Sequence, residues 1–257
     1  MNETSKKPEI VVFAGPNGSG KSTFTEFLKP PIDYINADEI KKNLKCSDLE
    51  AAQLAEKQRE NHLANMEEFC FETVLSTERN INLLKKAKEK GYFIRCYYVL
   101  TADPIINVYR VKSRVESGGH DVPEEKIISR YNKALSLIKD LLPICDVCHI
   151  YDNSENEPFR IFKKRKDQVF YDECNDWHLE DIQELTALNE LEKKSLNEYF
   201  SSSLPLFLRG RFFCGILQGK ECENESQRIE LRDEILCLRK PLCPAPYSLN
   251  IKALRFL

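Results

Sequence analysis

The sequence lacks several features that would assign it to a specialised class of protein. Its 257 residues carry a net charge of −3, so it has no excess of positive charge of the kind that marks dedicated nucleic-acid binders. No apolar run approaches the roughly 18 residues that a membrane-spanning helix needs. Residues 1–9 are polar, and the apolar run IVVFA that follows is too short for a secretory signal. We therefore expect a cytoplasmic protein without membrane contact, in which the ten cysteines are mostly reduced.

Internal repeats are absent as well, and strand patterns alternate with helix patterns instead. The apolar segments that predict strands are EIVVFAG, DYINADEI, EEFCFETVLS, YFIRCYYVL and ICDVCHIYDN. Helical patterns separate them, and strands joined by helices form parallel sheets with right-handed crossovers. The predicted fold class is therefore α/β, with a parallel sheet flanked by helices.

Local signals place the ends of several predicted helices. Ser47 and Glu50 form a capping box for a helix over about 48–66, and Thr77 is expected to cap the next helix, which Gly91 closes. Further along, the pattern predicts a helix over about 124–142, a hairpin from 158–163 and 168–171, and a helix near 179–199.

The character of the chain changes near its end. Residues 201–257 hold four prolines and four cysteines, and they carry a charge of +3 from nine Lys and Arg against six Asp and Glu. We predict a P-loop kinase domain over residues 1–190, followed by a helical linker and an irregular C-terminal appendage over 191–257.

The segment GPNGSGKST matches the phosphate-binding loop pattern G-x-x-x-x-G-K-[ST] and lies between a predicted strand and a predicted helix. Backbone N–H groups of such a loop surround phosphate oxygens, and the helix N-terminus adds a favourable dipole. We expect Lys21 to contact the β- and γ-phosphates of ATP and the Ser22 hydroxyl to bind Mg²⁺. The expected cofactor-binding residues are Gly15, Pro16, Asn17, Gly18, Ser19, Gly20, Lys21, Ser22 and Thr23.

Signatures of two other P-loop classes are missing. A transporter ATPase needs LSGGQ and a strand ending in Asp-Glu, but the chain has ESGGH at 116–120 and a strand ending in Thr-Ala-Asp. A GTPase needs Asn-Lys-x-Asp, and NKAL at 132–135 lacks the aspartate. A kinase-like arrangement remains, with a second substrate beside the γ-phosphate.

Two carboxylates are candidates for the acceptor side of such a site. Asp38 follows the second predicted strand, at the edge where ligands bind in parallel sheets, and is the best candidate to orient or deprotonate an acceptor hydroxyl. Its alternative role is to cap the next helix. Glu72 ends an apolar strand, where a carboxylate needs a partner, so we expect it to contact the substrate or a metal-bound water, with Thr73 assisting. The alternative for Glu72 is a structural ion pair.

The segment 109–131 has the pattern of a lid. Arg110 and Arg114 share one helix face, Gly118-Gly119 permits a sharp turn, and Arg130 begins the returning helix. The planar guanidinium binds phosphate through two hydrogen bonds, so we expect Arg114 and Arg130 above all to act on the phosphates during transfer. Solvated helix faces or pairs with neighbouring glutamates are the alternative, and His120 is expected to fix the lid turn.

Two further patterns have simpler explanations than the functions they suggest. CDVCH at 145–149 fits a haem-attachment motif, but it lies in a predicted core strand without an export signal, so its cysteines are expected to be ordinary buried residues. The tail cysteines Cys214, Cys222, Cys237 and Cys243 lack metal-site spacing. The basic run RIFKKRK at 160–166 is expected to be a solvated hairpin edge rather than a nucleic-acid surface.

Taken together, GPNGSGKST, INADEI, FETVLST, the lid segment and the final YDN resemble the zeta-toxin family, and more narrowly its small stand-alone bacterial branch. The resemblance covers about residues 8–185. It implies an adenylate-kinase-like P-loop NTPase fold. It also implies ATP-dependent phosphorylation of the 3′-hydroxyl of UDP-N-acetylglucosamine, which poisons peptidoglycan synthesis.

By motif position, the resemblance assigns roles to individual residues. Lys21 and Ser22 match the ATP and Mg²⁺ residues, Asp38 matches the catalytic carboxylate, and Glu72 matches a substrate-side acid. The lid arginines match Arg114 and Arg130, although the lid differs in shape from that of the best-known toxins. The implied partners are a sugar nucleotide and an antitoxin protein.

Two other functions stay open at this point. One is a kinase for a different small molecule, such as a nucleoside, a nucleotide or a drug. The other is a non-catalytic, ATP-gated module that uses the basic hairpin and tail to hold nucleic acid or a protein.

Overall fold

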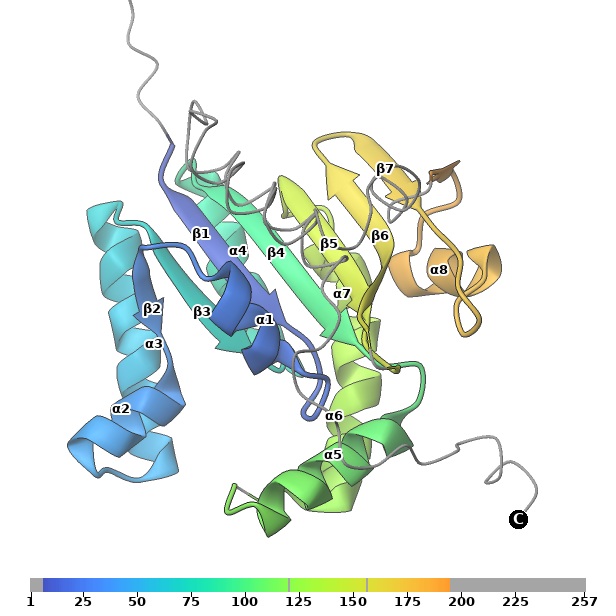
Figure 1. Ribbon diagram of the computed structural model, residues 1–257. Coiled ribbons are helices and arrows are strands. Elements are labelled where there is room, and N and C mark those ends of the chain that lie inside the picture. The colour runs from blue at the N-terminus through green and yellow to red at the C-terminus, as the bar shows by residue number, and fades with distance from the viewer. Residues whose placement is uncertain (1–6, 120, 156, 195–257) are drawn as a thin grey trace, which may run out of the picture.

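The computed structural model describes residues 7–119, 121–155 and 157–194, which form one α/β unit (Figure 1). Its strands are β1 (Glu9–Ala14), β2 (Asp33–Ile35), β3 (Phe69–Thr73), β4 (Phe93–Leu100), β5 (Val147–Asp152), β6 (Phe159–Arg165), β7 (Gln168–Tyr171) and β8 (Glu192–Lys193). Its helices are α1 (Lys21–Leu28), α2 (Ala37–Leu44), α3 (Asp48–Asn65), α4 (Glu78–Glu89), α5 (Pro104–Glu116), α6 (Glu124–Ser136), α7 (Ile138–Leu141) and α8 (Leu179–Thr186).

The strands of the described residues make one sheet in the order β2-β3-β1-β4-β5-β6-β7-β8. The first five strands in this order are parallel to one another. From β1 the chain first builds one side of the sheet, with β2 and β3, and then the other side, with β4 and β5. The carboxyl end of β1 is therefore the point at which ligands bind in open α/β sheets. The predicted fold class, a P-loop fold with a sheet flanked by helices, is confirmed.

Two apolar clusters hold helices against the faces of the sheet. On one face Val11 and Phe13 of β1 contact Phe24 and Leu28 of α1. On the other face Val12 belongs to a larger cluster that includes buried residues of α3, α4, α7 and α8. Alternate residues of β1 thus serve opposite faces, as the strand period of two requires. In Figure 1, α1 lies in front of the sheet and α4 lies behind it.

The capping box predicted for α3 is confirmed. The Ser47 hydroxyl accepts a hydrogen bond from the backbone N–H of Glu50, and the Glu50 carboxylate accepts one from the N–H of Ser47. Thr77 occupies the N-cap position of α4, but its side chain makes no capping hydrogen bond.

Two predicted helices are shorter in the structure. The helix expected over 124–142 is broken at Leu137, so that α6 and α7 are separate and Ile138 and Leu141 enter the core. The helix expected over 179–199 ends at Thr186, because Ala187 adopts a left-handed conformation and turns the chain. Leu188 and Leu191 then pack against the core, and β8 extends the sheet past residue 190.

The predicted hairpin is present as β6 and β7. Strand β6 runs antiparallel to β5 and to β7, whereas β7 pairs with β8 in parallel. The expectation that the basic run forms a solvated edge is wrong, because β6 lies between β5 and β7 and Arg160 is buried. The Lys164 ammonium donates hydrogen bonds to the carbonyls of Leu142 and Cys145.

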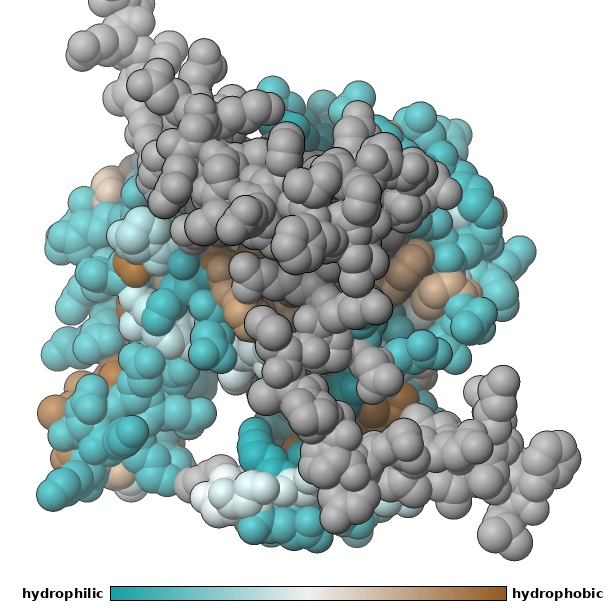
Figure 2. Space-filling model, in the orientation of Figure 1, coloured by the Kyte–Doolittle hydropathy of each residue, from teal (hydrophilic) through white to brown (hydrophobic). Residues whose placement is uncertain are grey.

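The visible described surface is largely hydrophilic (Figure 2). Within the described ranges, no helix combines the length and apolar character needed to cross a bilayer.

Candidate active site

The loop from Gly15 to Gly20 links β1 to α1 and is held against two neighbouring segments. A side chain at Gly15, whose φ is +142°, would bring its Cβ to 1.9 Å from the Val99 carbonyl oxygen of β4. At Gly20, with a φ of +96°, a Cβ would lie 2.4 Å from Asn153 Nδ2. At Gly15 the β4 backbone leaves no room for a side chain. At Gly20 the positive φ favours glycine, and a side chain would also displace the Asn153 amide.

Lys21 is the first residue of α1 and is nearly buried. Its ammonium donates a hydrogen bond of 2.8 Å to the Pro16 carbonyl oxygen, which folds the side chain back over the loop. Burial lowers the pKa of Lys21 to about 8, with Glu72 opposing the shift and Arg114 adding to it. The lysine is therefore held in the position where a phosphate-binding cation is needed, and it lies within electrostatic reach of both residues.

Glu72 joins the loop to the second strand. Its carboxylate accepts a hydrogen bond of 3.2 Å from the Ser22 hydroxyl and one of 2.8 Å from the Tyr34 hydroxyl. The amide of Asn36 in turn donates to the Tyr34 oxygen at 2.6 Å. The structure thus brings together Ser22, the expected Mg²⁺ ligand, and Glu72, the expected substrate-side acid.

A nucleotide with Mg²⁺ fits these groups. The Ser22 hydroxyl and the Glu72 carboxylate are oxygen donors of the kind Mg²⁺ takes, usually with several waters and the phosphates of the substrate. The glycine loop and the start of α1 provide backbone N–H groups for an anion.

Asp38 lies in the first turn of α2, directly after β2, and its side chain is exposed. The alternative that Asp38 caps α2 is wrong, because Asn36 is the N-cap and its side chain accepts the hydrogen bond from the Asp38 N–H at 2.8 Å. The Asp38 carboxylate is therefore left accessible at the edge of the sheet where the loop lies.

Thr73 has a clear structural partner. Its hydroxyl oxygen accepts hydrogen bonds from Asn80 of α4 at 2.8 Å and from the backbone of Leu75 at 2.9 Å. Leu75 has a φ of +53°, a conformation that leucine rarely adopts. Backbone strain of this kind concentrates at functional sites, and here it lies immediately after β3.

The three lid arginines have different surroundings. Arg130 of α6 approaches the loop, with 3.5 Å between its guanidinium and the Asn17 side-chain oxygen. Arg114 of α5 is exposed, and its charge reaches Lys21. Arg110 instead donates to the carbonyls of Asn153 and Ser154, so it fixes the segment after β5. His120 lies outside the described residues.

Two asparagines support the loop and were missed at the level of sequence. Asn153 donates a hydrogen bond of 2.8 Å to the Ser19 carbonyl. Asn107 of α5 is fully buried against Gly18, where a Cβ would lie 2.6 Å from the Asn107 carbonyl oxygen. The YDN motif at the end of the fifth strand pointed to Asn153, whereas nothing in the helical pattern distinguished Asn107.

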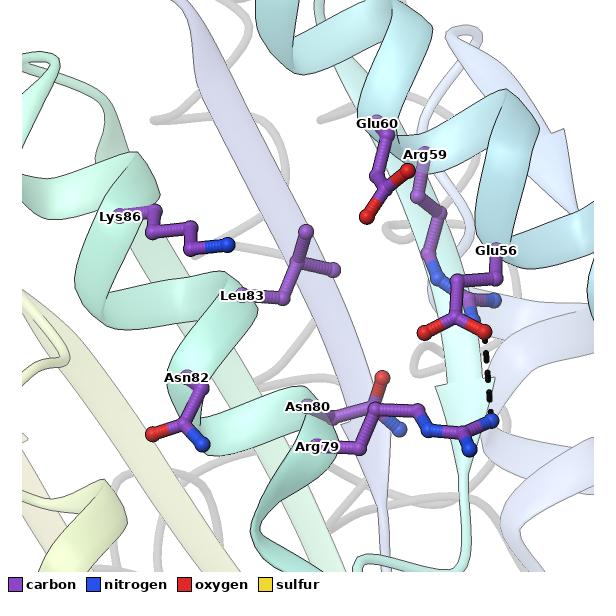
Figure 3. Close-up of a pocket in the computed structure, with 8 residues that line it drawn as sticks. All are labelled: Glu56, Arg59, Glu60, Arg79, Asn80, Asn82, Leu83 and Lys86. Carbon is purple, nitrogen blue, oxygen red and sulfur yellow. Dashed lines mark hydrogen bonds and ion pairs between the residues drawn. The ribbon is translucent and has the colours of Figure 1, made fainter.

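A pocket of about 190 Å³ lies between α3 and α4 (Figure 3). The residues that line it are Glu56, Arg59, Glu60, Arg79, Asn80, Asn82, Leu83 and Lys86. It adjoins the end of β3, because Asn80 is the residue that holds Thr73.

Arg59 is the most constrained cation of this pocket. Its guanidinium lies 5.1 Å from the centre of the Phe71 ring, and burial lowers its pKa. Its Nε is buried and has no hydrogen-bond partner within the described part of the chain. Arg79 forms an ion pair of 3.2 Å with Glu56, drawn as the dashed line in Figure 3. The pocket can therefore offer several charged groups to a polar ligand.

No protein-family model matches the chain. A protein of Haemophilus influenzae, described as an uncharacterized protein, is 32% identical over 129 residues, which cover 48% of this chain and 92% of that protein.

Two solved structures resemble the fold with TM-scores above 0.5, and a third has a score just below that value. The native AvrRxo1-ORF1:-ORF2 complex matches with a TM-score of 0.55 and 14% identity, over 90% of this chain and 75% of that chain. The AvrRxo1-ORF1:AvrRxo1-ORF2 structure with sulphate ions gives a TM-score of 0.52 at 14% identity, over 71% and 64%. A structure from work on the PezAT toxin-antitoxin system of Streptococcus pneumoniae gives 0.49 at 15% identity, over 93% and 91%.

Proposed function

This chain belongs to the same family as the Haemophilus influenzae protein and has a P-loop kinase fold, and from this premise we propose that it is an ATP-dependent kinase for a small-molecule hydroxyl group. The acceptor that we propose is a UDP-amino sugar such as UDP-N-acetylglucosamine. The observation that carries the proposal is the hydrogen bond between Ser22 and Glu72. It joins the donor half of the site, which we propose binds ATP, to the acceptor half, which we propose binds the hydroxyl substrate.

The donor half positions ATP. The N–H groups of residues 15–20 and the N-terminus of α1 would hold the phosphates, and Lys21 would contact the β- and γ-phosphates. The Ser22 hydroxyl would hold Mg²⁺, which would neutralise charge on the phosphate oxygens. Glu72 accepts a hydrogen bond from the Ser22 hydroxyl, which leaves the lone pairs of that hydroxyl free for the metal.

The acceptor half activates and orients the hydroxyl group. Asp38 accepts the proton of that hydroxyl as its oxygen attacks the γ-phosphorus of ATP, and ADP leaves. Arg114 and Arg130 stabilise the charge that spreads over the transferred phosphoryl group. Arg130 already lies beside Asn17 of the loop, and the charge of Arg114 reaches Lys21.

The pocket between α3 and α4 supports a sugar nucleotide as the acceptor. The cations Arg59, Arg79 and Lys86 suit a diphosphate. Asn80, Asn82 and the carboxylates of Glu56 and Glu60 suit the hydroxyl and amide groups of an amino sugar.

An acceptor screen tests the proposal. The purified protein is incubated with ATP, Mg²⁺ and single acceptors: UDP-N-acetylglucosamine, UDP-glucose, nucleosides, nucleotides and aminoglycoside drugs. Mass spectrometry then measures the gain of one phosphoryl group. We expect transfer to UDP-N-acetylglucosamine and none with Lys21→Ala. Transfer only to a nucleoside or a drug would identify that molecule, and not the UDP-amino sugar, as the acceptor. No transfer to any acceptor would contradict the kinase assignment.

The resemblance to zeta toxins adds an antitoxin protein to the proposed partners. If the product poisons wall synthesis, induced expression of the wild type in a bacterial host slows growth, whereas Lys21→Ala at equal expression does not. Equal growth of both strains would contradict the proposal that the product is toxic.

A further inference from the structure

Three cysteines from separate parts of the sequence meet inside the core. Cys96 of β4 and Cys148 of β5 are register partners on neighbouring strands, and Cys145 lies just before β5. Their sulfur atoms all lie within 4.8 Å of one another, and each residue is at most 1% exposed. The Cys-x-x-Cys spacing was visible in the sequence, but Cys96 joins it only through the pairing of β4 with β5.

We propose that Cys96, Cys145 and Cys148 bind one soft metal ion through their three sulfur atoms, with Cu(I) as the ion that fits best. A metal–sulfur bond of about 2.3 Å, as in zinc sites, implies sulfurs about 4 Å apart around a three-coordinate ion. The three sulfurs here all lie within 4.8 Å of one another, so a small shift would suffice. Thiolates select soft ions such as Cu(I) and Zn(II). Zn(II) in structural sites almost always takes four ligands. No fourth His, Cys, Asp or Glu joins the cluster within the described ranges, which favours Cu(I).

One nearby cation offsets part of the negative charge of bound thiolates. The Lys164 ammonium donates hydrogen bonds of 2.7 Å to the carbonyls of Leu142 and Cys145, and so lies beside the cluster. Without this cation, thiolates in an apolar core would be strongly destabilised.

The cluster is separate from the proposed kinase site. Cys145 precedes β5 and so lies at the amino ends of the parallel strands, whereas the phosphate loop follows the carboxyl end of β1. A bound ion would tie the turn before β5 to β4, where the Asp146 N–H already donates to the Ile94 carbonyl at 2.8 Å.

The test is metal retention by the full-length protein under anaerobic, reducing conditions. The protein is loaded with Cu(I) or with Zn(II) and challenged with a chromogenic chelator for that ion, and native mass spectrometry counts the ions per chain. Cys96→Ala and Cys145→Ala remove ligands. Cys70→Ala is the matched control, since Cys70 is a buried thiol of β3 that belongs to no such group. A second control replaces Cys214, Cys222, Cys237 and Cys243 with serine.

We expect one Cu(I) per chain in the wild type and in both controls. Each ligand variant should lose affinity by more than the roughly 10–100-fold that loss of an outer-shell partner costs. Circular dichroism establishes that each variant is folded, and two ligand variants are made so that one misfolded protein does not decide the result. Failure of the wild type to retain an ion, equal retention by Cys96→Ala, or loss of retention only in the tail variant would overturn the proposal. Retention of Zn(II) but not Cu(I) would overturn the choice of ion.

Discussion

At the scale of single residues, the burial of Lys21 predicts how the affinity for ATP depends on pH. Burial lowers its pKa to about 8, so its ammonium is present below that pH and is lost above it in the ATP-free protein. A cation at this position is needed to bind the phosphates. The affinity for ATP should therefore be constant from pH 6.5 to 7.5 and fall by up to about tenfold per pH unit above 8. Calorimetric titration of ATP across this range measures the effect.

The control for this pH profile is Lys21→Ala, which removes the titrating group. Its affinity for ATP should be low and nearly independent of pH between 7 and 9.5. A slope as steep as that of the wild type would assign the pH dependence to another group.

The hydrogen bonds of Glu72 give a second prediction at this scale. Tyr34→Phe removes the 2.8 Å bond to the carboxylate but keeps the ring. A hydrogen bond to a charged group contributes about 1.5–3 kcal/mol, so phosphoryl transfer should fall by about 10–100-fold if the bond orients Glu72 for catalysis. Steady-state kinetics with ATP and the acceptor measure this, and the Tyr109→Phe variant is the control, because Tyr109 is exposed on α5. Unchanged kcat/KM in Tyr34→Phe would assign Glu72 a structural role.

At the scale of elements, the ends of helices show what local sequence determines. The capping box of α3 was predictable because Ser47 and Glu50 are three residues apart and need no distant partner. The break at Leu137 and the early end of α8 were not predictable, because both depend on apolar side chains that reach the core of the assembled sheet. The position of β6 inside the sheet depends on its pairing with β5 in the same way.

Measurements of the free energy of unfolding can distinguish the N-cap of α3, Ser47, from the N-cap of α4, Thr77. Ser47→Ala removes both hydroxyl interactions with Glu50 and should lower the free energy of unfolding by about 1 kcal/mol. Thr77→Ala should change it less, because the Thr77 side chain makes no capping hydrogen bond. Urea unfolding of both variants provides the comparison, and an equal loss in the two would contradict the difference between the caps.

At the scale of the whole molecule, binding of ATP should stabilise the fold. The phosphate loop is held by β4 through Val99, by α5 through Asn107, and by the segment after β5 through Asn153. A ligand at 100 times its Kd stabilises the folded state by about 2.7 kcal/mol. For a domain of this size, that corresponds to an increase in Tm of about 5–11 °C.

Thermal unfolding with and without ATP and Mg²⁺ measures this increase. Lys21→Ala, at the same ligand concentration, should show an increase of less than half. If the wild type shows no increase at saturating ATP, the loop does not bind the nucleotide.

The candidate site itself was only partly predictable. The phosphate loop is continuous in sequence, so Lys21 and Ser22 could be assigned directly. The contacts of Glu72 with Tyr34, and of Arg130 with Asn17, join segments that only the parallel sheet and the lid helices bring together. The same holds for the pocket between α3 and α4, whose charged residues look like solvated helix faces in the sequence.

The most direct test of the kinase assignment is phosphoryl transfer by Asp38→Asn, measured on samples whose affinity for ATP is known. The carboxylate is exposed, and Asn36 caps α2, so the substitution should leave the fold and ATP binding unchanged. We predict that transfer from ATP to UDP-N-acetylglucosamine falls by at least about 100-fold, the contribution typical of a positioned general base. Full transfer by Asp38→Asn, at unchanged ATP affinity, would contradict the account.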